Sequence, residues 1–267
     1  MESEIKSSPL RRNRAFTLLE IILSLLVIVT VVFFGKKFLD ISAENVRSLE
    51  ESKIVDGELN LLLTRIREDL ESAVLLEKNQ PIFEICEKGD GKSLDMFFFT
   101  TNDEKHVTVG VRYDISELEF GHVEVQRTVL SDSATLLLQN ALSSGSSFSQ
   151  FFENMDPSHR QVYKFNVRLS SFKIRAAVEN SDGRVIFIHP NEKMAYFSGK
   201  LVCENVDRKS IIPGNLLFFD ITVRALLKND IAKFNSLKAS KPADAKEFLS
   251  MQSRKSFGRI KFNAMSF

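Results

Sequence analysis

One acidic residue, Glu20, lies near the start of a long apolar segment. The run from Ile21 to Phe34 contains no charged residue, and Phe16–Leu19 precede Glu20 with mostly apolar side chains. An ionised carboxylate among hydrocarbon groups loses its hydration, so it needs a partner or a function. A cationic group on a neighbouring helix would relieve the penalty, because opposite charges attract strongly where the dielectric constant is low. The alternative is that Glu20 lies close enough to a membrane surface to reach water or lipid headgroups.

Residue patterns of known catalytic and metal sites are missing from the sequence. The four histidines, His106, His122, His159 and His189, lack metal-ligand spacing, and there is no G-x-S-x-G or strand-linked G-x-G-x-x-G motif. The segment Gly89–Ser93 resembles the end of a phosphate-binding loop, but Cys86 occupies the position of its first glycine. Asp90 and Asp182 lie in turn clusters without the spacing of a calcium loop. We therefore expect no enzyme activity, metal or cofactor; a membrane-anchored extracytoplasmic enzyme stays as an alternative, because diffuse sites escape motif analysis.

Two cysteines, Cys86 and Cys203, are far apart in the sequence. In an oxidising compartment they could form one long-range disulfide, which on the loop-entropy model stabilises by roughly 3–5 kcal/mol. Two separate buried thiols are the other alternative. Sequence spacing does not choose between them.

Basic residues gather towards the C-terminus. They are Arg224, Lys228, Lys233, Lys238, Lys241, Lys246, Arg254, Lys255, Arg259 and Lys261. Such a surface could contact DNA, or it could be a solvated or subunit-facing side of the domain. The chain as a whole has a net charge of +1, which gives no general argument for a nucleic-acid partner.

The element that carries Glu20 is predicted to be one long helix over residues 16–77. Its first part, residues 16–35, has about 20 apolar-dominated positions, enough to cross a bilayer. Its second part has apolar residues at steps of three and four, namely Leu59, Leu62, Leu63, Ile66, Leu70, Ala73 and Val74. This stripe needs a partner surface, which the residues 78–267 should supply. That remainder is long enough for one sizeable core or two small lobes.

Residues 78–267 are predicted to be mostly strands with short helices. Alternating or apolar runs indicate strands at Ile82–Cys86, Met96–Thr101, His106–Ile115, His122–Leu130, Tyr163–Leu169, Phe172–Val178, Val185–His189, Ala195–Val202, Leu216–Ala225 and Gly258–Phe267. Helices are expected at Ala134–Leu142, Asp230–Leu237 and Pro242–Met251, and a loop over the Ser/Phe-rich stretch that ends at Pro157. The predicted fold class is α+β, with a long N-terminal helix packed on a mostly antiparallel sheet.

The segment Arg11–Phe34, with Ala15-Phe16-Thr17-Leu18-Leu19-Glu20 at its centre, resembles the class III leader of type IV pilins and type II secretion pseudopilins. It differs in having Ala15 where the family usually has Gly. A secretory signal would be cut after its apolar region, which no small-residue site here allows. A plain single-pass anchor would explain the length of the segment but not the FTLLE order.

Three further segments are loosely similar to the J-type minor pseudopilin and to the pilin-like cassette proteins of verrucomicrobial type. They are Leu63–Leu70, Leu94–Thr100 and Phe219–Leu226. The resemblance therefore implies a pilin-like sheet domain.

The resemblance also implies specific roles for residues near the N-terminus. A prepilin peptidase would remove the leader, residues 1–15, by cutting between Ala15 and Phe16, and would N-methylate Phe16. Glu20 would then pair with the freed amine of Phe16 in a neighbouring subunit.

Orientation follows from Lys6, Arg11, Arg12 and Arg14, which should keep the leader in the cytoplasm and place the remainder in the periplasm or outside the cell. The partners implied are the inner membrane, the peptidase and other pilin or pseudopilin subunits. The predicted function is that of a minor subunit in a type II secretion or type IV pilus-like fibre. A subunit for DNA uptake or adhesion is the alternative within the same family.

Overall fold

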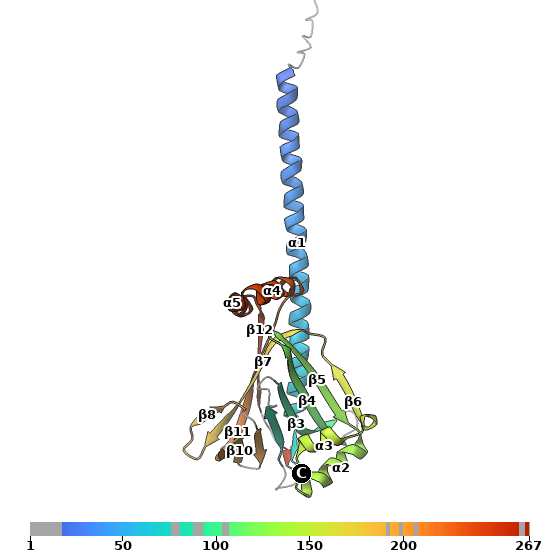
Figure 1. Ribbon diagram of the computed structural model, residues 1–267, viewed down its shortest axis with the longest axis vertical. Helices are drawn as coiled ribbons and strands as arrows, with labels where there is room; N and C mark the ends of the chain where they lie inside the picture. Colours follow the sequence, from blue (N-terminus) through green and yellow to red (C-terminus); the bar gives the residue numbers. More distant parts are fainter. Residues whose placement is uncertain are drawn as a thin grey trace, which may run out of the picture. The chain divides into compact units, whose positions relative to one another are not determined.

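The structure is a computed structural model that describes residues 18–75, 81–87, 93–102, 107–190, 193–197, 200–205, 208–261 and 265–266. The chain divides into two compact units, one ending at Glu50 and one running from Glu51 to Phe267. The first unit, where described, is helical. The second unit contains every strand described below (Figure 1).

Helix α1 (Leu18–Glu71) runs without interruption through the boundary between the units. It has no proline, and leucine, isoleucine and glutamate supply 25 of its 54 positions. The sequence predicted that it would continue to residue 77, but it ends at Glu71. The carbonyl of Ser72 accepts hydrogen bonds from the Thr101 amide and the Thr100 hydroxyl, so the chain turns into strand pairing instead of another helical turn. Strand β1 (Val74–Leu75) follows and pairs in parallel with β13 (Met265–Ser266).

The second unit is built on one antiparallel sheet. Its strands are β2 (Phe83–Glu87), β3 (Ser93–Asn102), β4 (Val107–Glu119), β5 (His122–Leu130), β6 (Arg160–Lys164), β7 (Leu169–Asn180), β8 (Val185–Ile188), β9 (Lys193–Phe197), β10 (Lys200–Asn205), β11 (Arg208–Ala225) and β12 (Arg254–Lys261). The α+β class and the antiparallel pairing that the sequence predicted are confirmed.

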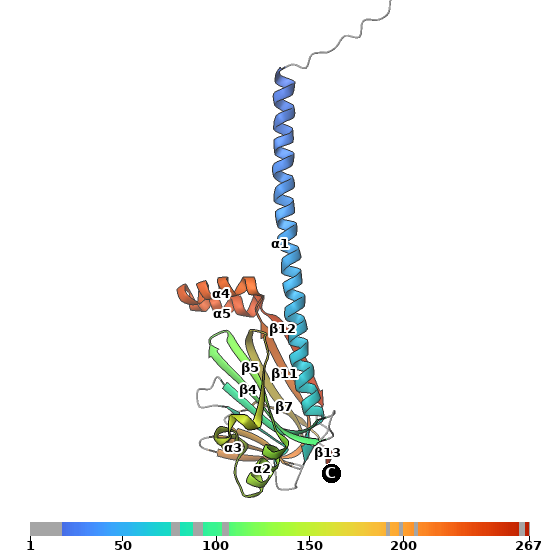
Figure 2. The same cartoon turned by 90° about the vertical axis from the view of Figure 1, so that its right-hand side faces the viewer.

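The sheet closes on itself into an eight-strand barrel, in the order β11-β10-β9-β2-β3-β4-β5-β7 and back to β11. The pilin-like sheet expected from the sequence is therefore wrong for this unit. Closure depends on the length of β11, which pairs with β10 through residues 208–213 and with β7 through residues 214–225. The joint between β5 and β7 is much shorter, because only Val123 and Leu169 are paired there. Strands β6, β8 and β12 extend the wall from β5, β7 and β11 (Figure 1), and Figure 2 shows β12 beside β11.

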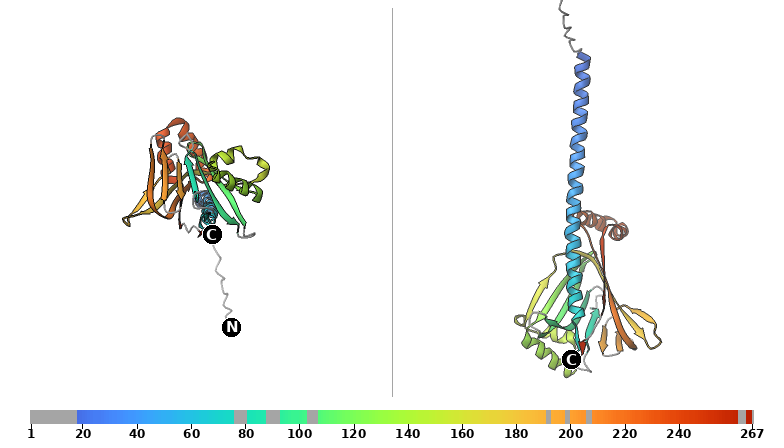
Figure 3. Two further views of the ribbon diagram at one scale, coloured as in Figure 1. Left: turned by 90° about the horizontal axis from the view of Figure 1, so that it is seen from below. Right: turned by 180° about the vertical axis from the view of Figure 1, so that it is seen from behind.

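The C-terminal part of α1 fills the concave side of this barrel (Figure 3). Leu59, Leu62, Leu63, Ile66 and Leu70 are at most 5% exposed and belong to the main core. The same core contains Phe83 and Phe98 from one side of the wall and Phe219 and Ile221 from the other. The partner surface predicted for the apolar stripe of α1 is thus the inner face of the barrel.

Two smaller clusters lie on the outside of the wall. Helices α2 (Asp132–Ser143) and α3 (Phe148–Asn154) cover Phe97 and Phe99 of β3, whose neighbours Met96 and Phe98 face the main core. Strand β3 is therefore buried on both faces, which explains its unbroken apolar run. Helices α4 (Lys228–Ser240) and α5 (Pro242–Gln252) pack on each other around Phe234 and Leu249.

Some local predictions were wrong. Helix α3 occupies the predicted loop before Pro157, and it begins where the Ser147 hydroxyl accepts the Gln150 amide. The predicted strand Ala195–Val202 is two strands, β9 and β10, which pair with each other. The last long strand, β12, begins at Arg254, whereas Gly258 was expected.

Candidate functional site

The apolar half of α1 is the segment that the sequence marks for function. Its large apolar side chains are exposed on every face, from 49% at Ile21 to 77% at Leu18. A helix that is apolar all round needs an apolar environment, either a membrane or the interior of a larger assembly. By length and composition α1 is able to cross a membrane, and it alone has this property among the described helices. The chain thus has a helix compatible with a single membrane span.

Glu20 lies in the first described turn of α1, before this apolar run. The polar side chains behind it are satisfied within the helix. The Ser24 hydroxyl donates to the Glu20 carbonyl at 2.7 Å, and the Thr30 hydroxyl donates to the Leu26 carbonyl at 2.7 Å. Glu20 is the charged side chain in the stretch Leu18–Phe34, and its polar neighbours Ser24 and Thr30 donate hydrogen bonds to carbonyls of the same helix.

Ala15 and Phe16, the predicted cleavage position, lie outside the described residues. Cleavage there and methylation of Phe16 stay predictions, and so does the pairing of the freed amine with Glu20.

The two cysteines are not brought together. Neither forms a disulfide; Cys86 lies on β2 and Cys203 on β10, and strand β9 lies between their strands. Strands two places apart are separated by about 9–10 Å, which exceeds the ~7 Å between Cα atoms that a disulfide spans. Cys86 is paired with Lys193 and Cys203 with Met194, so the two thiols also project from opposite faces of the sheet. The structure matches the alternative of two separate thiols.

A buried ion pair anchors the end of α1 inside the barrel. Asp69 accepts bonds from Arg127 Nε at 2.6 Å and Nη2 at 2.8 Å, and from the Tyr113 hydroxyl at 2.6 Å. These three residues are at most 6% exposed. Burial, and next the charge of Asp69, raises the pKa of Tyr113, so the phenol stays protonated and keeps donating. The arrangement ties α1 to β4 and β5 and is structural in character.

A second buried carboxylate, Asp220 on β11, lies on the outer face of the sheet. It accepts bonds from Arg175 on β7 and from Arg259 on β12, with the closest nitrogens at 2.8 Å. Burial acts to raise the pKa of Asp220, but the bonds from Arg259 and Arg175 outweigh it, and the pKa is lowered. Arg175 stacks on Phe187 at 4.4 Å from the ring centroid, and Arg259 stacks on Phe218 at 4.2 Å.

Sequence analysis missed both of these ion clusters. The sequence does contain one indication of such a cluster: a charged residue on the face of a helix or strand that is otherwise apolar. Asp69 is an example, because it lies on the same face of α1 as the apolar stripe. Its partners could not be named, because Asp69 and Arg127 are 58 residues apart in the chain.

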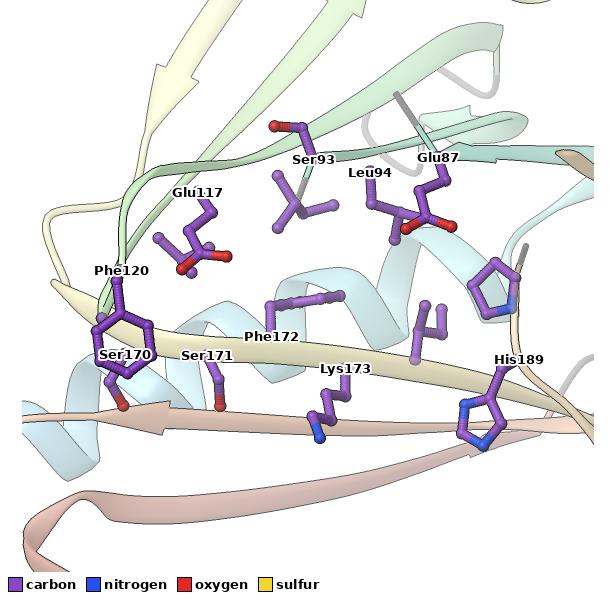
Figure 4. Close-up of a pocket in the computed structure, with 15 residues that line it drawn as sticks. Glu87, Ser93, Leu94, Glu117, Phe120, Ser170, Ser171, Phe172, Lys173 and His189 are labelled. Carbon is purple, nitrogen blue, oxygen red and sulfur yellow. The ribbon is translucent and has the colours of Figure 1, made fainter. Parts of the chain in front are cut away.

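A cleft of about 520 Å³ opens beside the short joint between β5 and β7. Its charged or titratable lining residues are Glu87, Glu117, Lys173 and His189, and apolar residues such as Leu94 and Phe172 line it as well. Figure 4 shows the two carboxylates apart from each other along the cleft, with Phe172 between β7 and the barrel interior. The cleft has no cysteine, and His189 is exposed at its rim. In the part of the chain that the structure describes, no group of three His, Cys, Asp or Glu side chains could hold a metal ion. The lining therefore carries both acidic and basic groups, and they form no recognisable catalytic set.

The histidines and C-terminal cations are dispersed. His106 lies outside the described residues. His122 Nδ1 is 3.9 Å from Glu119 Oε1, and His159 is the last residue of a short 3-10 helix. Lys238 donates to Glu119 at 2.9 Å, which lowers the pKa of that carboxyl. The predicted basic surface is thus partly neutralised by acids of the same unit.

Comparison with known proteins gives no relative. No family model, curated protein or solved structure matches this chain.

Proposed function

We propose that this chain is a structural subunit of a membrane-derived fibre of the type II secretion or type IV pilus kind, assembled through the first half of α1. The observation that carries the proposal is Glu20, a carboxylate in the first described turn of a helix whose following 14 residues, Ile21–Phe34, are uncharged. The order of residues around it, from Ala15 to Glu20, supports processing by a prepilin peptidase. The closed barrel gives no separate argument for this family, so the proposal depends on the N-terminal segment.

In this proposal the leader, residues 1–15, is cytoplasmic and the second unit is extracytoplasmic. Cleavage after Ala15 frees the amine of Phe16, which creates a cation at the end of an apolar helix. The amine of one subunit then pairs with Glu20 of the next. At 4 Å and an effective dielectric constant near 20, such a pair contributes on the order of 4 kcal/mol before desolvation costs. Processing and assembly are linked because only the cleaved chain has the cation. Apolar contacts between the α1 helices of neighbouring subunits hold the fibre together.

The test uses the full chain coexpressed with a prepilin peptidase, with and without the substitution Glu20→Ala. Mass spectrometry of the membrane-extracted wild type should find an N-terminal, methylated Phe16. The variant should insert into membranes in the same amount, whereas its assembled fraction, measured by crosslinking and sedimentation, should fall at least about tenfold.

Glu44→Ala is the matched control, since Glu44 is an exposed glutamate of α1 beyond the apolar run. It should assemble like the wild type. Native chains that keep residues 1–15 and still polymerise, or normal assembly of the Glu20 variant, would refute the proposed role.

A further inference from the structure

A second cleft, of about 460 Å³, lies on the outer face of the barrel and is lined by cations without acids. Its charged lining residues are Lys173 on β7, Arg224 on β11, Lys246 on α5 and Lys255 on β12. The hydroxyl residues Ser170, Ser171, Thr222 and Ser250 line it as well. The remaining lining residues are Phe120 and Leu249, and no carboxylate belongs to the lining.

The strand register explains why these side chains share one face. Asp220, Thr222 and Arg224 alternate with Phe219, Ile221 and Val223, which are fully buried in the barrel core. Thr222 is paired with Lys173, and Arg224 is paired with Ser171 on one side and Lys255 on the other. Figure 4 shows Ser171 and Lys173 leaving β7 on the side away from Glu117 and Glu87. Lys246, Leu249 and Ser250 of α5 contribute to the wall of the cleft at helical spacing.

The four cations of this cleft, of which Lys173, Lys246 and Lys255 are exposed, differ from four arginines elsewhere in the unit in their ionic partners. Arg112 binds Asp95 and Asp114, Arg127 binds Asp69, and Arg175 and Arg259 share Asp220. Among the described residues, neither Lys173, Arg224, Lys246 nor Lys255 makes an ion pair with an acid. The nearest carboxylate on β11, Asp220, is already saturated by its two arginines.

Like charges directly opposed across two strands destabilise a sheet, and Arg224 and Lys255 are such a pair. A second unsatisfied group lies beside them. Among the described residues, the hydroxyl of Ser170 is buried and has no hydrogen-bond partner, and the residue is 8% exposed. Both features are unfavourable, since buried polar groups are normally hydrogen-bonded. An anion with several oxygen atoms would relieve the repulsion between Arg224 and Lys255.

We infer that this cleft, the cationic cleft, binds a compact phosphate-bearing anion with two or more negative charges. Lysine and arginine side chains with hydroxyl donors are the groups that bind phosphate oxygens. The volume is that of a small-molecule site, so a ligand of diphosphate size fits better than a polymer. This inference is independent of the proposed fibre assembly, since it uses residues of the second unit alone.

The direct test is calorimetric titration of inorganic pyrophosphate into the full chain in an uncharged detergent and phosphate-free buffer. The wild type should bind one pyrophosphate saturably. Lys255→Ala and Lys246→Ala should each weaken binding about tenfold, the usual scale for one charge-assisted hydrogen bond. Lys228→Ala is the matched control, because Lys228 is an exposed cation of α4 outside the cleft. Its affinity should be unchanged. No saturable binding by the wild type, or an equal loss in the Lys228 variant, would overturn the inference.

Melting temperatures with and without pyrophosphate distinguish a lost binding site from a variant that folds poorly. Without pyrophosphate, Lys255→Gln should melt at or above the wild-type temperature, because it removes the repulsion with Arg224. Pyrophosphate at a concentration near the wild-type Kd should then raise the melting temperature of the wild type more than that of the variant. An equal rise in both proteins would count against the site.

Competition separates the sources of the phosphate. Displacement of pyrophosphate by dihexanoylphosphatidic acid, whose phosphomonoester can carry two negative charges, but not by dihexanoylphosphatidylcholine, would support the site with an anionic lipid headgroup as ligand. No displacement by either lipid would support it with a soluble phosphate compound. Affinity for oligothymidylate that keeps rising with its length would instead replace the compact ligand with a nucleic-acid surface, and would overturn the inference.

Discussion

Individual carboxylates in this protein have contrasting environments. Asp69 and Asp220 are each bound by guanidinium groups within the second unit, whereas Glu20 lies in the apolar part of α1, which is long and apolar enough to cross a membrane. The carboxylate group therefore serves internal structure in Asp69 and Asp220, and our proposal gives it an intermolecular role in Glu20.

The lowered pKa of Asp220 makes a prediction about acid stability. The folded-state pKa lies below the ~3.9 of an unfolded aspartate, so the unfolded chain binds more protons as the pH falls. The stabilisation is complete above about pH 5 and disappears as the pH falls towards the folded pKa. Asp220→Asn should lower the free energy of unfolding by about 1.5–3 kcal/mol at pH 7, and by much less at pH 3.

Urea unfolding at pH 7, 5 and 3 measures this difference. Asp182→Asn is the control, since Asp182 is exposed in a turn, and it should change stability little at any of these pH values. A difference between Asp220→Asn and wild type that stays constant down to pH 3 would contradict the argument.

At this scale the sequence revealed Glu20, because a charge within an apolar run is visible without any structure. It could not reveal the cationic cleft as a site. Lys246 and Lys255 appeared only as members of a basic segment. Their position near Lys173 depends on the pairing of β11 with both β7 and β12 and on the placement of α5. Long-range pairing of this kind leaves no local trace.

The long helix α1 has different surroundings in its two halves. Its first half exposes apolar side chains on all sides, and its second half buries one stripe in the barrel. The periodicity predicted both halves correctly, because apolar spacing in a helix directly reports which faces need cover. The end of the helix was misplaced, since the hydrogen bonds of Ser72 to Thr100 and Thr101 are not encoded near Ser72.

Two adjacent leucines of α1 provide a test of this stripe. Leu62 is fully buried, while its neighbour Leu61 is 65% exposed. Leu62→Ala should cost about 2–5 kcal/mol, through lost burial and the cavity left inside the barrel. Leu61→Ala should change the free energy of unfolding by less than about 0.5 kcal/mol. Denaturant unfolding of both variants checks the prediction, and similar losses in the two would show that α1 does not fill the barrel as described.

Strand positions were predicted better than their arrangement. His122–Leu130 was predicted with the bounds that β5 has, because its alternation and flanking turns are local. Closure of the barrel was not foreseen. It requires β11 to change its pairing partner from β10 to β7 near Pro213 and Gly214. An alternating pattern predicts that a segment is a strand, but it does not predict which other strand pairs with it.

For the molecule as a whole, the boundary at Glu50 separates the apolar part of α1 from the part that belongs to the barrel. The residues from Glu51 onwards contain a complete core, including the helix stripe from Leu59 to Leu70. A unit with its own core is expected to fold alone.

Two truncations test this division. A fragment of residues 51–267 should be soluble and unfold in one cooperative transition. A fragment of residues 78–267 should aggregate, because it exposes the barrel interior and loses Asp69, the partner of Arg127. Circular dichroism during heating and gel filtration distinguish the outcomes. A well-folded monomer from residue 78 would mean that the helix only lies against a barrel that is stable without it.

The two cysteines lie at positions where their reactivity can report local unfolding on the two sides of the barrel wall. Cys203 contacts the interior cluster and Cys86 the cluster beneath α2 and α3, so each sulfur monitors a different side of the same wall. Burial raises the pKa of both thiols, so little reactive thiolate forms while the protein is folded. Alkylating reagents should therefore modify each cysteine chiefly when the cluster around it unfolds locally. The order in which the two cysteines are alkylated would show which side of the barrel wall unfolds first, and no cysteine has to be introduced by mutation.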